Sequence, residues 1–307
     1  MAFLLPILLL TCSHSIASLQ KNMEFRVFLP RLTPLEAKSS FSHAKYDAVL
    51  SNLISSFGDL NGSSLERRDD IYLIGGCHFG VKFRAGKKLE IKIRLKKLNF
   101  NIEHWKKVKL GKKSLNHYRS EIVTLLQEES DQPQPEDAEL IKAEKYFTVQ
   151  KARSTQLFGE VSKEICFISS TSDPRNWLSF AVEGSLEDIQ NFLSSKVEPH
   201  SDLNYLLEAL HISSDMARRD PALLPVVAGY PTWIRIASNH SRGIEEFNEV
   251  LSSVDSFLSS LTFVPSSTTD VAVDDTTSLI SQHPSVATQK KKSPPSEERP
   301  TVCFGFC

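Results

Sequence analysis

The stretch from residue 69 to residue 95 constrains the fold of this chain more than any other, because charged and apolar side chains alternate along most of it. A period of two in an extended chain sends successive side chains to opposite faces of a sheet. In the pieces 80–84 and 89–95 one face is ionic and the other is apolar. The link at 85–88 contains Gly86, which can supply the positive φ angle that a tight hairpin needs. We therefore expect antiparallel strands with one ionic face.

Similar alternation recurs up to residue 184 and predicts further strands at 24–30, 102–110, 146–153, 164–168 and 177–184. Apolar residues at helical spacing occur at 46–57, at 118–128 and after Ser185, a residue type that caps helices. About eight strands with few helices between them are what a closed antiparallel β-barrel requires. The predicted fold is therefore of the α+β class, a barrel that encloses a tunnel, with helices packed on its outside.

Beyond residue 199 the sequence changes to helical spacing, with apolar faces at 203–210 and 244–261. Because the second of these covers fewer heptads than a stable coiled coil needs, we expect it to pack against the parent domain. We interpret residues 23–199 as the barrel and residues 200–264 as a helical layer on its outside. The tripeptide Gly229, Tyr230 and Pro231 is expected to form a loop between two helices of that layer.

The two ends of the chain differ from its centre in composition. Residues 1–22 form an apolar leader that is too short to span a bilayer. It is either a secretory signal peptide cleaved near Ala17 or an extension upstream of a functional start at Met23. The positively charged segment of a signal peptide is missing. We favour the second interpretation, because the family resemblance described below implies a cytoplasmic protein.

Residues 265–307 are rich in Ser, Thr, Pro and Asp and have no sustained apolar period. Such a segment cannot bury enough apolar surface to offset its ordering entropy, so we expect a disordered tail. Its last cysteines, Cys303 and Cys307, do not form a prenylation box, and acylation beside Lys290 to Lys292 is the alternative.

Charge is distributed unevenly along the chain. The formal net charge is -1, yet 13 Lys or Arg residues and only 2 acids lie between Lys82 and Lys113. This local excess predicts an anionic ligand, and for the surface of 87–113 also a weak contact with an anionic polymer or lipid. The five cysteines lack the CxxC or His spacing of a zinc site and do not suggest a disulfide framework.

Four strands, in their order and spacing, resemble those of a known family, the CYTH or triphosphate tunnel superfamily. They are the basic strand 80–84, the following strand 89–92, the Lys-x-Arg strand 149–153 and the acidic strand 180–183 that precedes a helix. The superfamily includes thiamine triphosphatases, inorganic triphosphatases and class IV adenylate cyclases. The resemblance spans about residues 24–195. It implies a barrel whose inward cations bind a triphosphate.

The chain departs from this family mainly at its acidic residues. The family opens with a Glu-x-Glu-x-Lys strand, where this chain has Glu24, Arg26 and Phe28, so only the first acid is kept. The late acidic strand normally carries two glutamates, and here only Glu183 is present. By resemblance these acids would hold a divalent metal, Mg²⁺ or Mn²⁺. The remaining candidate metal ligands are Glu24, Glu90 and Glu183.

The candidate phosphate-binding residues are the cations that strand parity places on the inward face: Arg26, Lys82, Arg84, Lys92, Arg94, Lys151 and Arg153. Together with three inward acids they would produce a net positive field that attracts a polyanion. Hydrolysis of a triphosphate asks for such cations, for a metal held by carboxylates and for an oriented water. The expected function is therefore the binding of a triphosphate-containing small molecule, with weak metal-dependent hydrolysis.

Two other interpretations remain open. The chain could be a non-catalytic module that holds nucleic acid or lipid headgroups on 87–113, with a steep salt dependence. It could also be an inactive relative, a pseudoenzyme that serves as a scaffold. No Gly-x-Ser-x-Gly, P-loop or His-rich pattern supports another enzyme class. The resemblance implies a cytoplasmic protein, and the secretory pathway would apply if residues 1–20 are a signal peptide.

Overall fold

The computed structural model describes residues 23–58, 65–84, 88–195, 198–238 and 244–261. By its contacts the chain divides into two compact units, Met1–Ser266 and Ser267–Cys307, and all described residues belong to the first. The predicted leader, the tail at 265–307 and the hairpin link at 85–87 lie outside the described residues. None of the helices in the described ranges has the length and hydropathy of a membrane span.

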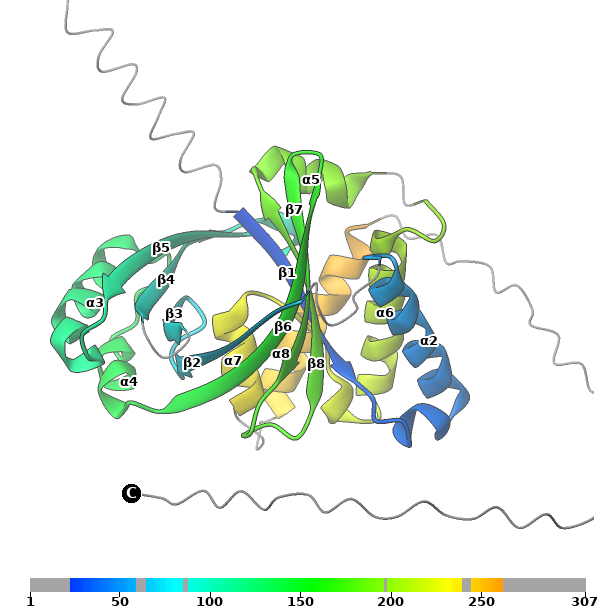
Figure 1. The fold of residues 1–307 in the computed structure, drawn as a ribbon, viewed down its shortest axis with the longest axis horizontal. Coiled ribbons are helices and arrows are strands. Elements are labelled where there is room, and N and C mark those ends of the chain that lie inside the picture. Colours follow the sequence, from blue (N-terminus) through cyan, green and yellow to red (C-terminus); the bar gives the residue numbers. More distant parts are fainter. Residues whose placement is uncertain (1–22, 59–64, 85–87, 196–197, 239–243, 262–307) are drawn as a thin grey trace, which may run out of the picture. The chain divides into compact units, whose positions relative to one another are not determined.

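Eight strands form a closed antiparallel barrel, which confirms the predicted fold class (Figure 1). The barrel order is β5-β4-β3-β2-β6-β7-β8-β1, and the pairing of β1 with β5 closes it. The short strand β9 joins β1 beyond the end of the β5 pairing, where Val27 lies opposite Val227. The strands are β1 (Met23–Arg31), β2 (Glu66–Leu73), β3 (Phe79–Arg84), β4 (Lys88–Lys97), β5 (Glu103–Gly111), β6 (Tyr146–Phe158), β7 (Val161–Ser169), β8 (Asn176–Gly184) and β9 (Val226–Val227).

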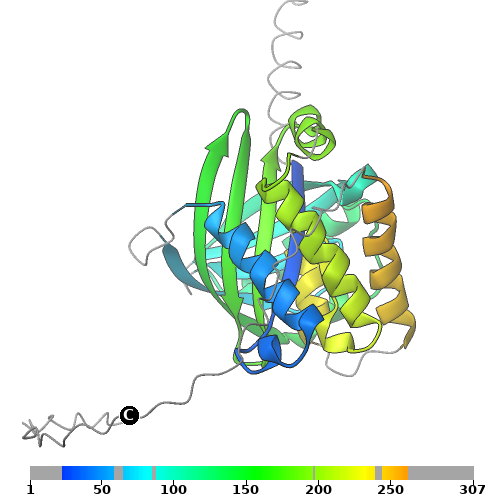
Figure 2. The same cartoon turned by 90° about the vertical axis from the view of Figure 1, so that its right-hand side faces the viewer.

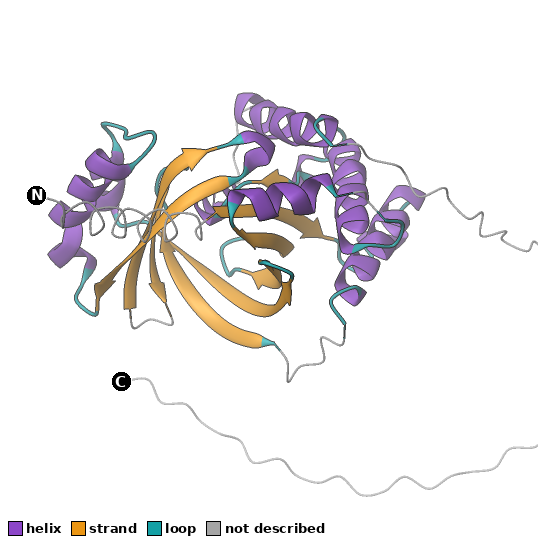
Figure 3. Cartoon of the chain, turned by 90° about the horizontal axis from the view of Figure 1, so that it is seen from above, coloured by secondary structure: helices purple, strands orange, loops and turns teal. Residues whose placement is uncertain are grey.

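Helices cover the barrel on two sides (Figures 2 and 3). Four of them, α2, α5, α6 and α8, pack on the outward apolar side chains of β1, β7 and β8. Two others, α3 and α4, contribute to a separate core with β3, β4 and β5. The bounds are α2 (Phe41–Ser55), α3 (Leu115–Glu129), α4 (Asp137–Ala143), α5 (Leu186–Ser194), α6 (Asp202–Ala217), α7 (Tyr230–Ser238) and α8 (Ile244–Ser259), with short 3₁₀ turns at Glu36–Lys38, Asn99–Asn101 and Pro221–Leu223.

Local sequence signals set several helix ends as expected. The Ser185 hydroxyl accepts a hydrogen bond from the Asp188 backbone N–H at 3.1 Å and so caps α5. In α2 the side chains that the helical spacing assigns to one face, Tyr46, Val49, Leu50 and Leu53, are the buried ones. Capping and an apolar stripe together determine where such helices begin and which face they bury.

Helix α7 differs from the prediction, because it packs inside the barrel. Its residues Tyr230, Trp233 and Ile234 share a buried cluster with inward side chains such as Phe28 and Trp177. The expected loop at 229–231 is therefore wrong, since the helix begins at Tyr230. Within 200–264, helices α6 and α8 pack on the outside of the barrel, β9 extends the sheet and α7 fills part of the lumen. An apolar helix surface of this kind is stable only where another apolar surface covers it.

Side chains divide the lumen of the barrel into two halves. Along β1 the inward residues change from Glu24 and Arg26 to Phe28, and along β6 they change from Arg153 and Lys151 to aliphatic and aromatic residues. The aromatic half is filled by α7. The charged half keeps the space that forms the candidate site.

Candidate functional site

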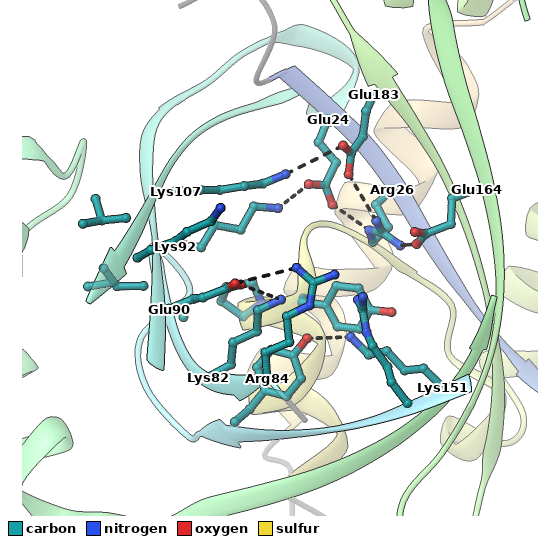
Figure 4. A pocket seen from close by; sticks show the side chains of 18 of the residues that line it. Glu24, Arg26, Lys82, Arg84, Glu90, Lys92, Lys107, Lys151, Glu164 and Glu183 are labelled. Atoms are coloured by element: carbon teal, nitrogen blue, oxygen red, sulfur yellow. Dashed lines mark hydrogen bonds and ion pairs between the residues drawn. The ribbon is translucent and has the colours of Figure 1, made fainter. Parts of the chain in front are cut away.

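The charged half of the lumen contains a cavity of about 230 Å³ (Figure 4). Tyr230 and Pro231 at the start of α7 belong to its lining, so the helix closes the cavity on that side. Pro231 comes so close to β3 that a Cβ atom at Gly80 would lie 2.9 Å from its Cγ. The other lining residues are Glu24, Arg26, Arg68, Tyr72, Gly80, Lys82, Arg84, Glu90, Ile91, Lys92, Lys107, Val108, Lys109, Lys151, Arg153, Glu164 and Glu183.

Most of the residues singled out in the sequence come together here. The lining includes all three candidate acids and six of the seven candidate cations, namely Arg26, Lys82, Arg84, Lys92, Lys151 and Arg153. They come from five different strands. Side chains that alternate along each strand therefore meet in one shared cavity when the barrel closes.

Arg94 is the exception, because it does not line the cavity. It lies opposite Trp105 in the sheet, one inward position beyond Lys92 and in the half of the lumen that α7 occupies. Its guanidinium donates to Asp131 at 3.1 Å and to Glu103 at 3.4 Å. Glu103 in turn accepts from the Gly229 backbone N–H at 2.7 Å. Arg94 therefore helps to fix the start of α7, and strand parity alone could not distinguish this depth in the barrel.

The structure adds charged lining residues that the sequence analysis did not single out as site residues: Arg68, Lys107, Lys109 and Glu164. Each lies two positions from another inward residue of its strand, so a strict parity count extended to the strand ends would have found them. Lys107 and Lys109 had been assigned to an outer surface at 87–113. Because both line the cavity, as does Lys92, that surface is less basic than the sequence suggested.

Two aromatic residues, Tyr72 and Tyr230, form the floor of the cavity. Their rings are stacked with centroids 5.8 Å apart, and Lys151 lies 3.6 Å above the Tyr230 ring centroid. Tyr72 could have been found from the parity of β2. Tyr230 could not, because the sequence analysis predicted a loop at this position, whereas it starts a helix inside the barrel.

Carboxylates inside the barrel hold the cations in place. Glu24 forms ion pairs with Arg26, at 2.6 Å, and with Lys92. Burial acts to raise the pKa of Glu24, but Lys92 and Arg26 outweigh it and hold this pKa well below its usual range. At Glu164, burial also acts to raise the pKa. Arg26 and Arg153 outweigh this effect and lower the pKa of Glu164 to about 2. Both carboxylates are therefore ionised at neutral pH.

Lys151 lies deepest among the cations. Its ammonium donates to the Tyr72 hydroxyl at 2.5 Å and pairs with Asp70 at 3.2 Å. Burial lowers the pKa of Lys151 to about 7, an effect that the attraction of Asp70 only partly offsets. The pKa of Lys82 is also lowered by burial, and the attraction of Asp70 and Glu90 only partly offsets this effect.

The cavity keeps a positive excess after these pairings. Nine cationic side chains and four carboxylates line it. Near the solvent the side chains of Arg84, Lys107 and Glu183 are 40%, 52% and 40% exposed, so an anion can reach the cations from this side. A confined space with one dominant sign of charge concentrates ligands of the opposite sign.

The three candidate metal ligands do not form a metal centre. Glu24 and Glu183 lie opposite each other on β1 and β8, whereas Glu90 lies apart from them and pairs with Lys82 and Arg84 (Figure 4). Within the described ranges no group of three or more His, Cys, Asp or Glu residues has the geometry to hold a metal ion. Since a divalent cation requires several free oxygen ligands, the residues present do not fit a protein-held Mg²⁺ or Mn²⁺.

Comparisons with known proteins do not show a family for this chain. No family model matches the sequence, and no curated protein matches it significantly. Among solved structures, a putative adenylate cyclase from Bacillus halodurans is similar with a TM-score of 0.27 and 12% identity, covering 56% of this chain and 89% of that one. The S. pombe Pct1 RNA triphosphatase is similar with a TM-score of 0.22 and 11% identity, covering 71% of this chain and 91% of that one. At such scores neither likeness carries a conclusion about this chain, and the closed eight-strand barrel rests on its own strand pairings.

Proposed function

We propose that this protein binds the triphosphate group of a small molecule in the charged half of its barrel. One observation carries the proposal: nine cationic side chains from the barrel strands converge on a single cavity that only four carboxylates line. In the absence of an anion these like charges repel one another, and a polyanion relieves that repulsion. Flexible lysines and the planar guanidinium of arginine are also the side chains that suit phosphate oxygens best.

The size of the cavity favours a compact anionic group. Its volume of about 230 Å³ is below the roughly 300–1,000 Å³ of pockets that enclose a drug-sized ligand. The phosphate groups would therefore lie inside, and the remainder of the ligand would lie at the solvent side near Arg84 and Lys107. Because Tyr230 and Pro231 close the other side, the ligand would enter with its phosphate end first.

The proposal assigns binding and no hydrolytic step. All four carboxylates that line the cavity, Glu183 included, are each engaged by two cations, so none of them is free to activate a water. The alternative of an outer surface for nucleic acid or lipid has less support, because cations assigned to it line the cavity.

A thermal unfolding experiment on the full chain tests this function. Tripolyphosphate at about one hundred times its dissociation constant should stabilise the fold by about 2.7 kcal/mol. For a domain of this size that corresponds to an increase in Tm of roughly 5–10 °C. Sulfate at equal ionic strength should shift the Tm much less. No shift with millimolar tripolyphosphate would contradict the proposed function.

Two neighbouring lysines on β5 provide a matched control for this experiment. Lys107 points into the cavity, whereas Lys106 points outward and pairs with Glu129 at 2.8 Å. Their side chains are similarly exposed, at 52% and 40%. Lys107→Met should weaken tripolyphosphate binding about tenfold, as expected for one lost charged hydrogen bond, and Lys106→Met should leave it unchanged. Equal effects of the two substitutions would place the anion outside the barrel.

A further inference from the structure

Arg26 is surrounded by three carboxylates that come from three adjacent strands. Its Nε lies 2.6 Å from Glu24 on β1, its Nη1 lies 2.8 Å from Glu164 on β7, and its Nη2 lies 3.8 Å from Glu183 on β8. Nη1 also donates to the Ser179 hydroxyl at 2.9 Å. The guanidinium lies over the Tyr230 ring, 4.7 Å from its centroid, and Arg26 is only 4% exposed. Each of the three nitrogens of its planar fork therefore has a carboxylate partner.

The second oxygen of each carboxylate lies on a cation of the cavity (Figure 4). Glu24 Oε2 pairs with Lys92, Glu164 Oε2 pairs with Arg153 at 2.9 Å, and Glu183 Oε2 lies 3.7 Å from Lys107. Arg26 is thus linked to three other cations, in each case through one carboxylate. All three of these cations line the cavity. Removal of Arg26 would release three carboxylates at once, and with them the side chains that they hold.

We propose that Arg26 is a resident cation that balances the charge of three carboxylates, as a bound metal ion would otherwise have to do, and that anion binding by this protein requires no divalent metal. This inference rests on the proposed function and makes it more specific. Arg26 acts as a positioning residue, because it orients Lys92, Lys107 and Arg153 toward the ligand through carboxylates. It also neutralises acids that would otherwise repel a phosphate group.

Physical chemistry favours an arginine over a bound ion at this position. A guanidinium stays protonated at any pH at which the protein is folded, and its fork can bind several carboxylates in fixed directions. Burial acts to lower the pKa of Arg26, but Glu24 and Glu164 outweigh it and raise this pKa well above its usual value. Both oxygens of Glu24 and of Glu164 are paired, so a divalent cation that took one of them as a ligand would have to displace the cation already bound there.

The first test uses the unmodified full chain, so it does not depend on the folding of any variant. Tripolyphosphate binding is measured by calorimetry in EDTA and, separately, with excess Mg²⁺. The inference predicts that the dissociation constant in EDTA is at least as low as with Mg²⁺, since the metal only competes for the ligand. A loss of more than tenfold in EDTA, restored by Mg²⁺, would overturn the inference and leave the proposed function intact. No binding under either condition would refute both.

The second test replaces the guanidinium and then supplies it again. Arg26→Ala should weaken tripolyphosphate binding at least tenfold, and Arg31→Ala should not, because Arg31 is exposed on the same strand and does not line the cavity. Guanidinium ion at about 10 mM should restore much of the affinity of the Arg26 variant. Urea, a neutral molecule of the same shape, should not restore it. Wild-type affinity in the variant, or equal rescue by urea, would refute the role of a resident cation.

Discussion

Replacing Trp233 with alanine is expected to lower the free energy of unfolding by about 3–5 kcal/mol, the range for a large aromatic residue removed from a core. The Trp233 side chain is fully buried where α7 fills the barrel. Its ring stacks on Phe28 with centroids 4.9 Å apart and meets Phe147 and Trp177 edge to face, both at 5.9 Å. Because the barrel wall cannot collapse into the space that an indole leaves, most of the packing energy should be lost.

Urea denaturation of the wild-type and variant chains measures this loss. Phe41→Ala is the control, because Phe41 lies at the start of α2 and its exposed fraction is 83%. A substitution of an exposed side chain usually changes stability by less than about 0.5 kcal/mol. If Trp233→Ala costs no more than Phe41→Ala, α7 does not support the barrel from within.

The second large expected effect is a rise in the free energy of unfolding with pH. Folding lowers the pKa of Lys151 from 10.5 to about 7, so between these values the unfolded chain binds more protons than the folded chain. Stability must then rise with pH over this interval, by up to about 1.4 kcal/mol per pH unit. Lys82 contributes in the same direction, since its pKa is also lowered. Burial raises the pKa of Cys166 above 9.0, which opposes the trend at higher pH, so the window to examine runs from pH 7 to about pH 9.

The measurement is the urea unfolding free energy at several pH values in this window, with and without Lys151→Met. The wild-type chain should become more stable as the pH rises, and the slope should be much smaller in the variant. Only the slope is compared, because Asp70 loses a partner in the variant and the absolute stability changes as well. If the unfolding free energy of Lys151→Met depends on pH as steeply as that of the wild-type chain, a group other than Lys151 causes the pH dependence.

Strand parity predicted most of the barrel and of its charged lumen. The strands, their antiparallel pairing and the inward direction of Lys82, Lys92 and Arg153 follow from a period of two, which is a local property of the sequence. The depth at which an inward residue lies in the lumen is not a local property of the sequence. Whether an inward cation such as Arg94 faces the cavity or the closing helix depends on register across the sheet and on a helix that lies more than one hundred residues away in sequence.

The position of α7 was also beyond sequence reasoning. Gly229 and Pro231 are residue types that are common in turns, so the local signal favoured a loop. What turns this segment into a helix is tertiary: Glu103 binds the Gly229 backbone N–H and the aromatic half of the lumen covers Trp233. Parity likewise gave the inward direction of the candidate metal ligands Glu24, Glu90 and Glu183, but not the cations with which each of them pairs.

The central claim is that the anion lies inside the barrel among the inward cations. A crystal structure of the full chain with tripolyphosphate tests it most directly. The prediction is density for the phosphates above Tyr230, with their oxygens within hydrogen-bonding distance of Lys82, Lys92 and Lys107. Phosphates bound on the outer face near Lys106, with the cavity holding only solvent, would contradict it.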